Sequence, residues 1–201
     1  RVQESQLRAA FARLEQQVAT KLRHYYQTRD PQTGELIPVL YFFWVKTVTT
    51  PDGETVPLLS RYVFAQDAYP KKKPKAQIVC PSCWGVVEDR YDATDLACPH
   101  CAHRFNPQEG PASGQYVTGK SGGRYRIKDL LPSDGRPLAH RLYAIMALRP
   151  DGEKVYLPVR DEDLALYAEA EAMLQRENLP LPTLAVRPGH NTDQARGYNY
   201  T

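Results

Sequence analysis

The arrangement of the cysteines constrains this chain more than any other feature. All four cysteines lie in two Cys-x-x-C units, Cys80–Cys83 and Cys98–Cys101, with fourteen residues between them. Each unit predicts a tight turn that directs two thiolates to one point, and two such turns can surround a Zn²⁺ ion tetrahedrally. Four thiolate ligands leave no coordination position for water. We therefore expect a structural zinc ribbon whose ligands are Cys80, Cys83, Cys98 and Cys101.

Three other uses of these cysteines stay open. Cys98-Pro99-His100-Cys101 matches the active-site tetrapeptide of disulfide oxidoreductases, although Asn106-Pro107 follows where such a site needs a long helix. Structural disulfides would require an oxidising compartment, but the chain begins with Arg1 and has no secretory leader, so we expect a cytoplasmic protein. His100 or His103 could also replace one sulfur ligand.

Composition places the chain among ordinary globular proteins. Hydrophobic residues make up 42% of the 201 residues and charged residues 24%, which disfavours overall disorder. No apolar run approaches the roughly 18 residues that a membrane span needs, so we expect no membrane partner. Because the chain does not start with Met, we expect it to be a piece of a longer protein.

Two segments predict helices. Apolar residues recur at spacings of three and four through residues 4–27, which predicts an amphipathic helix with one face on a core. A coiled-coil partner helix is the alternative interpretation of this stripe. Residues 161–177 predict a second helix, because Asp161, Glu162 and Asp163 suit its positive N-terminal end. We expect its apolar side to comprise Leu164, Tyr167, Ala168, Met173 and Leu174.

Two β-hairpins with the same turn sequence are predicted. Residues 38–49 and 55–64 flank Pro51-Asp52-Gly53-Glu54, and residues 141–149 and 155–159 flank Pro150-Asp151-Gly152-Glu153. The two hairpins could pair into one sheet, either as an internal repeat or because this turn sequence is common. The fold class that follows is α+β, with antiparallel hairpins, two flanking helices and an inserted zinc ribbon.

Three segments follow from these patterns. We expect residues 1–69 to hold the first helix and hairpin, and residues 70–110 a basic linker and the zinc ribbon. Residues 111–201 should hold a Gly-rich connector, the second hairpin and helix, and a docking tail from residue 183. The first and third segments should form one core.

Basic residues concentrate around the predicted ribbon. Residues 70–128 contain ten Lys and Arg but five Asp and Glu, although the whole chain carries a net charge of only +3. Such residues beside a zinc ribbon could contact phosphates of duplex DNA, or they could belong to a solvated linker. The candidate nucleic-acid contacts are Lys71, Lys72, Lys73, Lys75, Lys120, Arg124 and Arg126.

One nucleotide-binding pattern is expected to be accidental. Residues 114–121 fit the phosphate-binding loop pattern G-x-x-x-x-G-K-[ST], which functions only between a buried strand and a helix. A Pro- and Gly-containing loop precedes it, and Gly122-Gly123 follows, which disfavours a helix. The chain shows no other arrangement of catalytic residues, so we predict no catalytic site.

Several segments, taken in order, resemble one family. They are Tyr41–Leu59, the Cys80–Cys83 unit, Arg141–Ala144, Leu157–Leu164 and Arg187–Tyr200. This set resembles the central, zinc-ribbon-containing region of adenine-specific DNA methylases, from about Tyr41 onward. Relatives often carry a further Cys pair near the first hairpin turn, which this chain lacks.

The resemblance implies an enzyme that transfers a methyl group from S-adenosylmethionine to the adenine amine. In that family a Gly-rich cofactor motif precedes this region and an Asp-Pro-Pro-Tyr-type catalytic motif follows it. The chain contains no Pro-Pro dipeptide and no strand-linked G-x-G-x-x-G, so neither motif can be assigned to it. The hypothesis is a zinc-binding insertion that engages DNA or packs on the catalytic domain of the same parent chain. The alternative is a stand-alone zinc-ribbon adaptor that binds protein.

Overall fold

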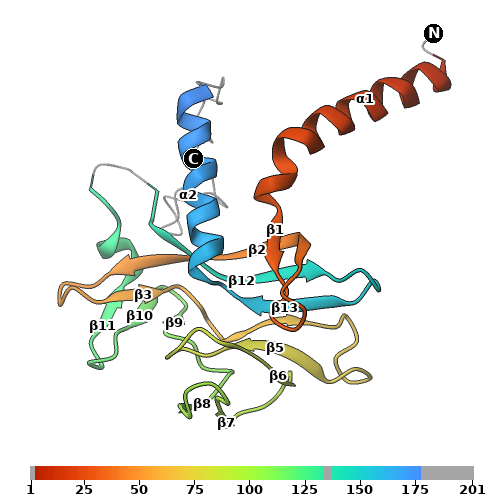
Figure 1. The fold of residues 1–201 in the computed structure, drawn as a ribbon. Coiled ribbons are helices and arrows are strands. Elements are labelled where there is room, and N and C mark those ends of the chain that lie inside the picture. The colour runs from red at the N-terminus through yellow and green to blue at the C-terminus, as the bar shows by residue number, and fades with distance from the viewer. Residues whose placement is uncertain (1–2, 134–136, 178–201) are drawn as a thin grey trace. The chain divides into compact units, whose positions relative to one another are not determined.

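The computed structural model describes residues 3–133 and 137–177, and its fold is α+β, as the sequence predicts (Figure 1). Two α-helices and several small antiparallel sheets make up the described residues. These residues divide into two compact units. Unit 1 comprises residues 3–42, 145–156 and 160–177, and unit 2 comprises residues 43–133, 137–144 and 157–159.

Unit 1 begins with the first helix, α1 (Glu4–Leu22), which continues into the 3₁₀ helix η1 (Arg23–Tyr25). The helix starts with a capping box, in which the backbone N–H of Gln3 donates to Gln6 Oε1 at 3.2 Å. Strand β1 (Gln27–Arg29) then pairs antiparallel with the start of the next strand, with Thr28 opposite Ile37.

The apolar stripe of α1 does not pack on a core, so that expectation is wrong. The helix has no buried residue, and Phe11 exposes 64% of its surface. Beyond the stripe, at η1, Tyr25 Oη donates to Met173 Sδ of the second helix at 3.3 Å. Nothing described in unit 1 covers the stripe.

The second helix, α2 (Asp161–Glu177), has the predicted bounds, and its predicted apolar side is confirmed in part, since Tyr167 and Met173 are half-buried. Leu164 and Leu174, expected on the buried side, expose 46% and 40% of their surface, whereas Asp163 is buried. Asp163 Oδ1 accepts a hydrogen bond from Thr28 Oγ1 at 2.7 Å, and its Oδ2 accepts one from the backbone N–H of Arg160 at 2.9 Å. Because the side chain of Asp163 is hydrogen-bonded at the helix start, the contact face of α2 does not include Leu164 and Leu174.

Both predicted hairpins are present, and their turns are alike. In each turn the residue before the proline donates its N–H to the glutamate carbonyl, at 2.8 Å and 2.9 Å, and the glycine donates back at 2.9 Å. Gly53 and Gly152 have φ of +79° and +88°, a conformation that glycine adopts without steric cost. The hairpin strands are β2 (Leu36–Thr49), β3 (Thr55–Pro57), β12 (His140–Leu148) and β13 (Lys154–Pro158). They belong to one sheet, in the order β1-β2-β12-β13 with β3 paired to β2.

The return strand of the first hairpin is shorter than predicted. Only residues 55–57 pair with β2, and residues 63–66 form β4 (Val63–Gln66) of another sheet. The backbone N–H of Leu58 still donates to the carbonyl of Lys46 at 2.8 Å, so the pairing with β2 ends just after Pro57. Strand β4 pairs with β5 (Lys75–Val79), which also pairs with β6 (Val86–Arg90).

The residues of the apparent phosphate-binding loop form part of a small sheet in unit 2. This sheet contains β9 (Ala112–Ser113), β10 (Tyr116–Thr118) and β11 (Arg124–Arg126), followed by the 3₁₀ helix η2 (Ile127–Leu130). Strand β11 follows Lys120-Ser121 where a phosphate-binding loop would require a helix. The nucleotide-binding pattern is therefore accidental, as predicted.

Among residues 3–133 and 137–177, neither α-helix combines the length and the apolar character needed to cross a bilayer. The predicted docking tail, from residue 183 onward, lies outside the described residues.

Candidate metal centre

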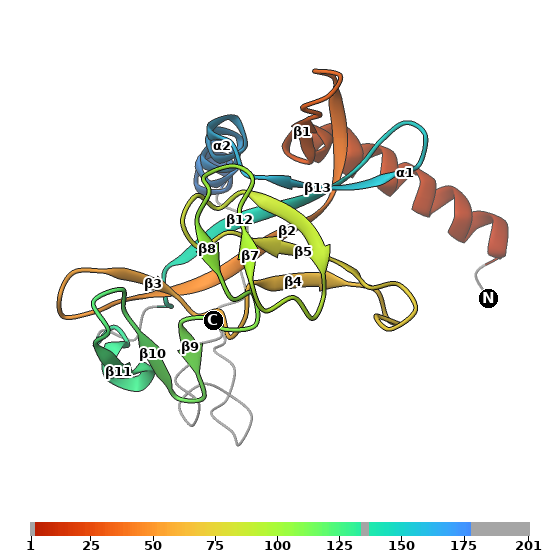
Figure 2. The same ribbon diagram turned by 90° about the horizontal axis from the view of Figure 1, so that it is seen from below.

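The four cysteines lie in two knuckles between short strands of unit 2. The first knuckle, Cys80–Cys83, connects β5 to β6. The second knuckle, Cys98–Cys101, connects β7 (Leu96–Ala97) to β8 (Arg104–Phe105), which pair with each other (Figure 2). Each pair of thiols therefore sits at the end of a hairpin, as the Cys-x-x-C pattern predicts.

The two knuckles share one backbone geometry. The residue after the second cysteine is left-handed in both, with φ of +61° at Trp84 and +59° at Ala102. Its N–H donates to the carbonyl of the first cysteine, at 3.0 Å in the first knuckle and 2.8 Å in the second. The N–H of the first cysteine donates to the carbonyl two residues after the second cysteine, at 2.9 Å in both. These bonds turn both thiols of a knuckle to the same side.

The sulfur atoms form a compact cluster. Sγ of Cys80 lies 3.7 Å from Sγ of Cys101, and Sγ of Cys83 lies 3.7 Å from Sγ of Cys98. All four sulfurs lie within 4.8 Å of one another. A tetrahedral zinc site with Zn–S bonds of about 2.3 Å has sulfurs about 3.8 Å apart. The four thiols can therefore hold one divalent ion and leave no position open for substrate or water.

The surroundings of the thiols are unequal. Burial raises the pKa of Cys80 to about 12, and burial also raises the pKa of Cys83. The backbone N–H of His103 is the main cause that lowers the pKa of the Cys101 thiol to about 7. Further N–H groups point at the sulfurs, including that of Gly85, which lies 3.4 Å from Cys83 Sγ. Such N–H donors stabilise thiolates, so each knuckle offers negatively charged sulfur ligands and partly offsets their charge with backbone N–H groups.

The other uses of the cysteines fit this geometry poorly. Sulfurs 3.7 Å apart are not joined in disulfides, whose S–S bonds are about 2.05 Å, and all four cysteines are free. Strand β8 follows Cys101 where a disulfide oxidoreductase would need a helix. His100 Nε2 interacts with the carbonyl of Val86 at 3.2 Å, and His103 stacks on Phe105. Neither histidine belongs to the cluster of potential metal ligands found in the described residues.

The apolar residues of the ribbon belong to two clusters. Ile78 and Leu96 pack with Val63 and Ala76, and Val87 and Phe105 pack against them, as residues of one cluster. Trp84 and Val86 join a second cluster instead, which contains Val45, Val79, Tyr143 and Ala144. The first knuckle is thereby packed on β2 and β12 residues of unit 2, whereas the second knuckle rests on the β4–β5–β6 sheet.

Sequence reasoning missed three residues that support the first knuckle. The guanidinium of Arg141 lies 4.3 Å from the centroid of the Trp84 ring, and Tyr143 contacts the same ring at 6.4 Å between centroids. Gly85 also leaves room for the His100 ring, since a Cβ there would lie 2.6 Å from it and would displace that side chain. The C-x-x-C-x-G pattern was a signal for Gly85, but nothing near Cys83 in sequence points to Arg141.

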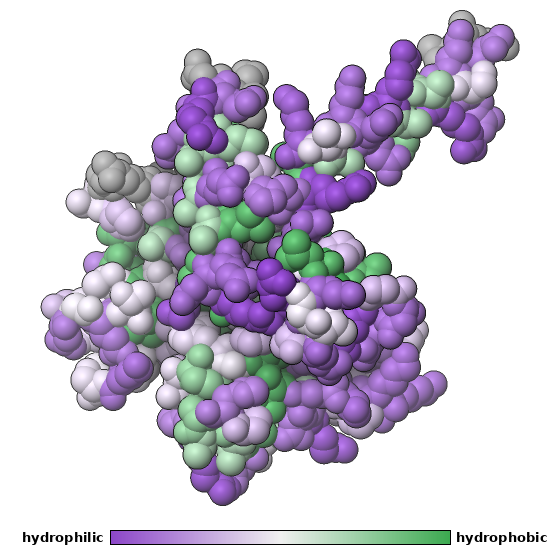
Figure 3. All heavy atoms as spheres, viewed as in Figure 1, coloured by the Kyte–Doolittle hydropathy of each residue, from purple (hydrophilic) through white to green (hydrophobic). Residues whose placement is uncertain are grey.

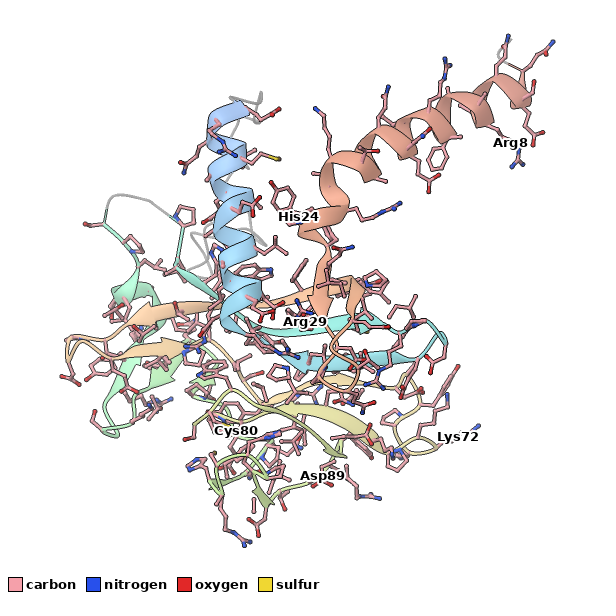
Figure 4. All side chains as sticks on the ribbon, viewed as in Figure 1. Arg8, His24, Arg29, Lys72, Cys80 and Asp89 are labelled. Carbon is pink, nitrogen blue, oxygen red and sulfur yellow. The ribbon has the colours of Figure 1, made fainter. Side chains whose placement is uncertain are left out.

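The first set of predicted nucleic-acid contacts lies beside the ribbon strands. Lys71, Lys72 and Lys73 occupy the turn between β4 and β5, and Lys72 points away from the sheet (Figure 4). Lys73 Nζ lies 3.2 Å from Asp67 Oδ2, and Lys75 Nζ donates to Glu88 Oε1 at 2.6 Å. Lys73 and Lys75 therefore form ion pairs with carboxylates.

The second set lies on the β10–β11 hairpin. Arg124 and Arg126 are on β11, and Lys120 is in the turn before it. The Arg124 guanidinium lies 4.2 Å from the centroid of the Tyr116 ring. The β4–β5 turn and this hairpin lie at different ends of unit 2 in both views (Figures 1 and 2). The structure thus gathers each set locally and does not join the two into one patch.

Comparisons of this chain with protein-family models, with curated proteins and with solved structures returned no match. Function is therefore inferred from the cysteine cluster, from the charge pattern and from the resemblance of the sequence segments.

Proposed function

We propose that this chain is the zinc-binding, target-engaging region of an adenine-specific DNA methyltransferase. The observation that carries the metal part is the cluster of four thiols, with paired sulfurs 3.7 Å apart on knuckles of identical geometry. A closed four-thiolate site binds zinc for structure and performs no chemistry itself. In this proposal the metal fixes the β5–β8 ribbon as a rigid projection from unit 2.

The DNA part of the proposal is supported by the charges beside that ribbon. Lys71 and Lys72 are exposed at the β4–β5 turn, next to the strand that leads into the first knuckle. Lysines on a rigid turn can contact phosphates in a fixed register, which positions a duplex without reading its sequence. The β10–β11 hairpin offers a second, separate pair of cations in Arg124 and Arg126.

Methyl transfer is assigned to another part of the parent protein. The sequence contains neither a Pro-Pro dipeptide nor a strand-linked G-x-G-x-x-G, so no residue of this chain is proposed to bind S-adenosylmethionine or to react. The catalytic domain of the same parent chain is the second proposed partner. The region would raise catalysis by holding DNA or by stabilising that domain.

The experiment is duplex-DNA binding by the zinc-loaded chain over a salt series. Binding should weaken steeply with salt, and replacing Lys71, Lys72 and Lys73 by Ala should reduce the log–log slope by about one per lysine that contacts a phosphate. The matched control replaces three cations of unit 1, Arg13, Lys154 and Arg176, by Ala, which gives the same net charge. This control should leave the slope nearly unchanged.

Two results would reject the DNA part. One is undetectable binding at low salt by a chain that contains its zinc. The other is an equal loss of slope in both triple variants, which would mean that net charge alone matters. Either result would favour the alternative, a zinc-ribbon adaptor that binds protein.

A further inference from the structure

The first helix carries an apolar stripe that the rest of its unit leaves uncovered. Leu7, Phe11 and Leu14 expose 63%, 64% and 58% of their surface, and Val18 exposes 45%. Their spacing of four, three and four residues is that of the d, a, d and a positions of a heptad repeat. Apolar side chains appear between hydrophilic ones along this helix (Figure 3). A stripe of this kind is stable in water only when another surface covers it.

The stripe ends in opposite charges. At 100° per residue, Glu4 continues it toward the N-terminus and Lys21 continues it toward the C-terminus. In heptad terms Glu4 is the a position before Leu7, and Lys21 is the d position after Val18. The seam of α1 is therefore acidic at one end, apolar in the middle and basic at the other end.

We propose that α1 pairs with α1 of a second copy of this chain in an antiparallel coiled coil. In the register that aligns the two apolar stripes, Phe11 faces Leu14 of the second copy, and Leu7 faces Val18 of the second copy. The same register brings Glu4 opposite Lys21 of the second copy, and the two-fold symmetry repeats every pair. Each of the six seam residues of one helix thus meets a complementary residue.

Charge decides the direction of the pair. A parallel arrangement would place Glu4 against Glu4 and Lys21 against Lys21 within the seam, which is repulsive at both ends. The antiparallel arrangement also aligns opposite ends of the two helix dipoles. Outside the seam, Arg8 and Glu15 occupy e positions, which face each other in an antiparallel pair and carry opposite charges.

The first test measures the mass of the full 201-residue chain by sedimentation over a roughly hundredfold concentration range. A monomer–dimer equilibrium is expected, with modest affinity because the seam spans fewer than three heptads. Phe11→Ser and Leu14→Ser should each raise the dissociation constant by about a hundredfold or more, since each removes two side chains from the seam. Gln16→Ser, on the opposite face of α1, is the control and should leave the constant unchanged.

The second test reads the direction. Glu4→Lys places a second positive charge opposite Lys21 in the antiparallel pair and should weaken the dimer several-fold, and Lys21→Glu should do the same. The double variant Glu4→Lys, Lys21→Glu restores opposite charges and should restore the dimer. Both single changes also oppose the helix dipole, and Glu4→Lys removes the ion pair of Glu4 with Arg8, but the double variant keeps both penalties, so recovery separates pairing from helix stability. Circular dichroism confirms that the variants retain their helices.

Three results would overturn the proposal. A chain that stays monomeric throughout would mean that a different surface covers the stripe, such as a catalytic domain or another protein. A dimer that is insensitive to Phe11→Ser would form elsewhere on the molecule. A dimer that responds to Phe11→Ser but not to Glu4→Lys would not have the antiparallel register.

Discussion

Removal of the metal should open the two knuckles unequally. The perturbation is chelation of zinc from the intact chain, followed by measurement of amide hydrogen exchange. Residues 98–105 pair only through the two-residue strands β7 and β8, with Leu96 opposite Phe105 and Ala97 opposite Arg104. We expect this segment to lose its protection first, because little besides the metal fixes it.

The magnitude follows from the structure. Ordering the eight backbone residues 98–105 costs about 1–2 kcal/mol each, or about 8–16 kcal/mol. The left-handed conformation of Ala102 adds about 1–2 kcal/mol. The two backbone hydrogen bonds of the knuckle return only about 1 kcal/mol each. Zinc binding to such sites contributes about 10–16 kcal/mol, which offsets most of the deficit, and the packing of Phe105 against the Ile78 cluster adds a smaller contribution.

The first knuckle has an additional source of stability. Trp84 and Val86 pack in the cluster that contains Tyr143, and burying a large apolar side chain contributes about 1.5–3 kcal/mol. Protection at β5 and β6 should therefore fall less than protection at residues 98–105, and α2 in unit 1 should be unaffected. Unchanged exchange at residues 98–105 after verified loss of zinc would refute the reasoning.

Three further predictions follow from single side chains. Asp163→Ala should destabilise the protein by about 1–3 kcal/mol in urea unfolding, because it leaves buried donors without their acceptor, whereas Asp161→Ala at the exposed start of the same helix should cost far less. Ala102→Gly should stabilise the zinc-loaded chain by up to about 1 kcal/mol and so raise its melting temperature, since glycine adopts the left-handed conformation freely. A lower melting temperature would contradict this. The hydrogen bond from Arg149 lowers the pKa of Asp30. This pair should therefore stabilise unit 1 fully above the unfolded pKa of about 3.8, and its contribution should be lost as the pH falls through the lower folded pKa. Asp30→Asn should reduce the loss of stability that unit 1 shows on acidification.

Local patterns predicted the elements that local chemistry determines. The cysteine spacing gave the four candidate ligands, and the repeated Pro-Asp-Gly-Glu turns gave both hairpins, because knuckles and tight turns are fixed by the residues within them. The bounds of α2 followed from the three acidic residues at its start. In each case the determining residues are neighbours in the chain.

The errors arose where contacts between distant segments decide. The face of α2 is set by the hydrogen bond between Thr28 and Asp163, which are 135 residues apart. The second half of the expected return strand pairs with β5 instead of β2, and Val63 packs with Ile78 in one apolar cluster. The exposed stripe of α1 has the same spacing as a buried one, so periodicity alone could not distinguish a core face from an interface.

The most direct measurement for the central claim is zinc K-edge X-ray absorption on the purified chain, with the metal content determined on the same sample. We expect one zinc ion per chain, coordinated by four sulfur atoms at about 2.3 Å. Replacing any one of Cys80, Cys83, Cys98 and Cys101 by Ser should lower the sulfur count and the affinity together. A folded chain without metal, or a zinc shell with nitrogen or oxygen ligands in place of sulfur, would contradict the four-thiolate centre.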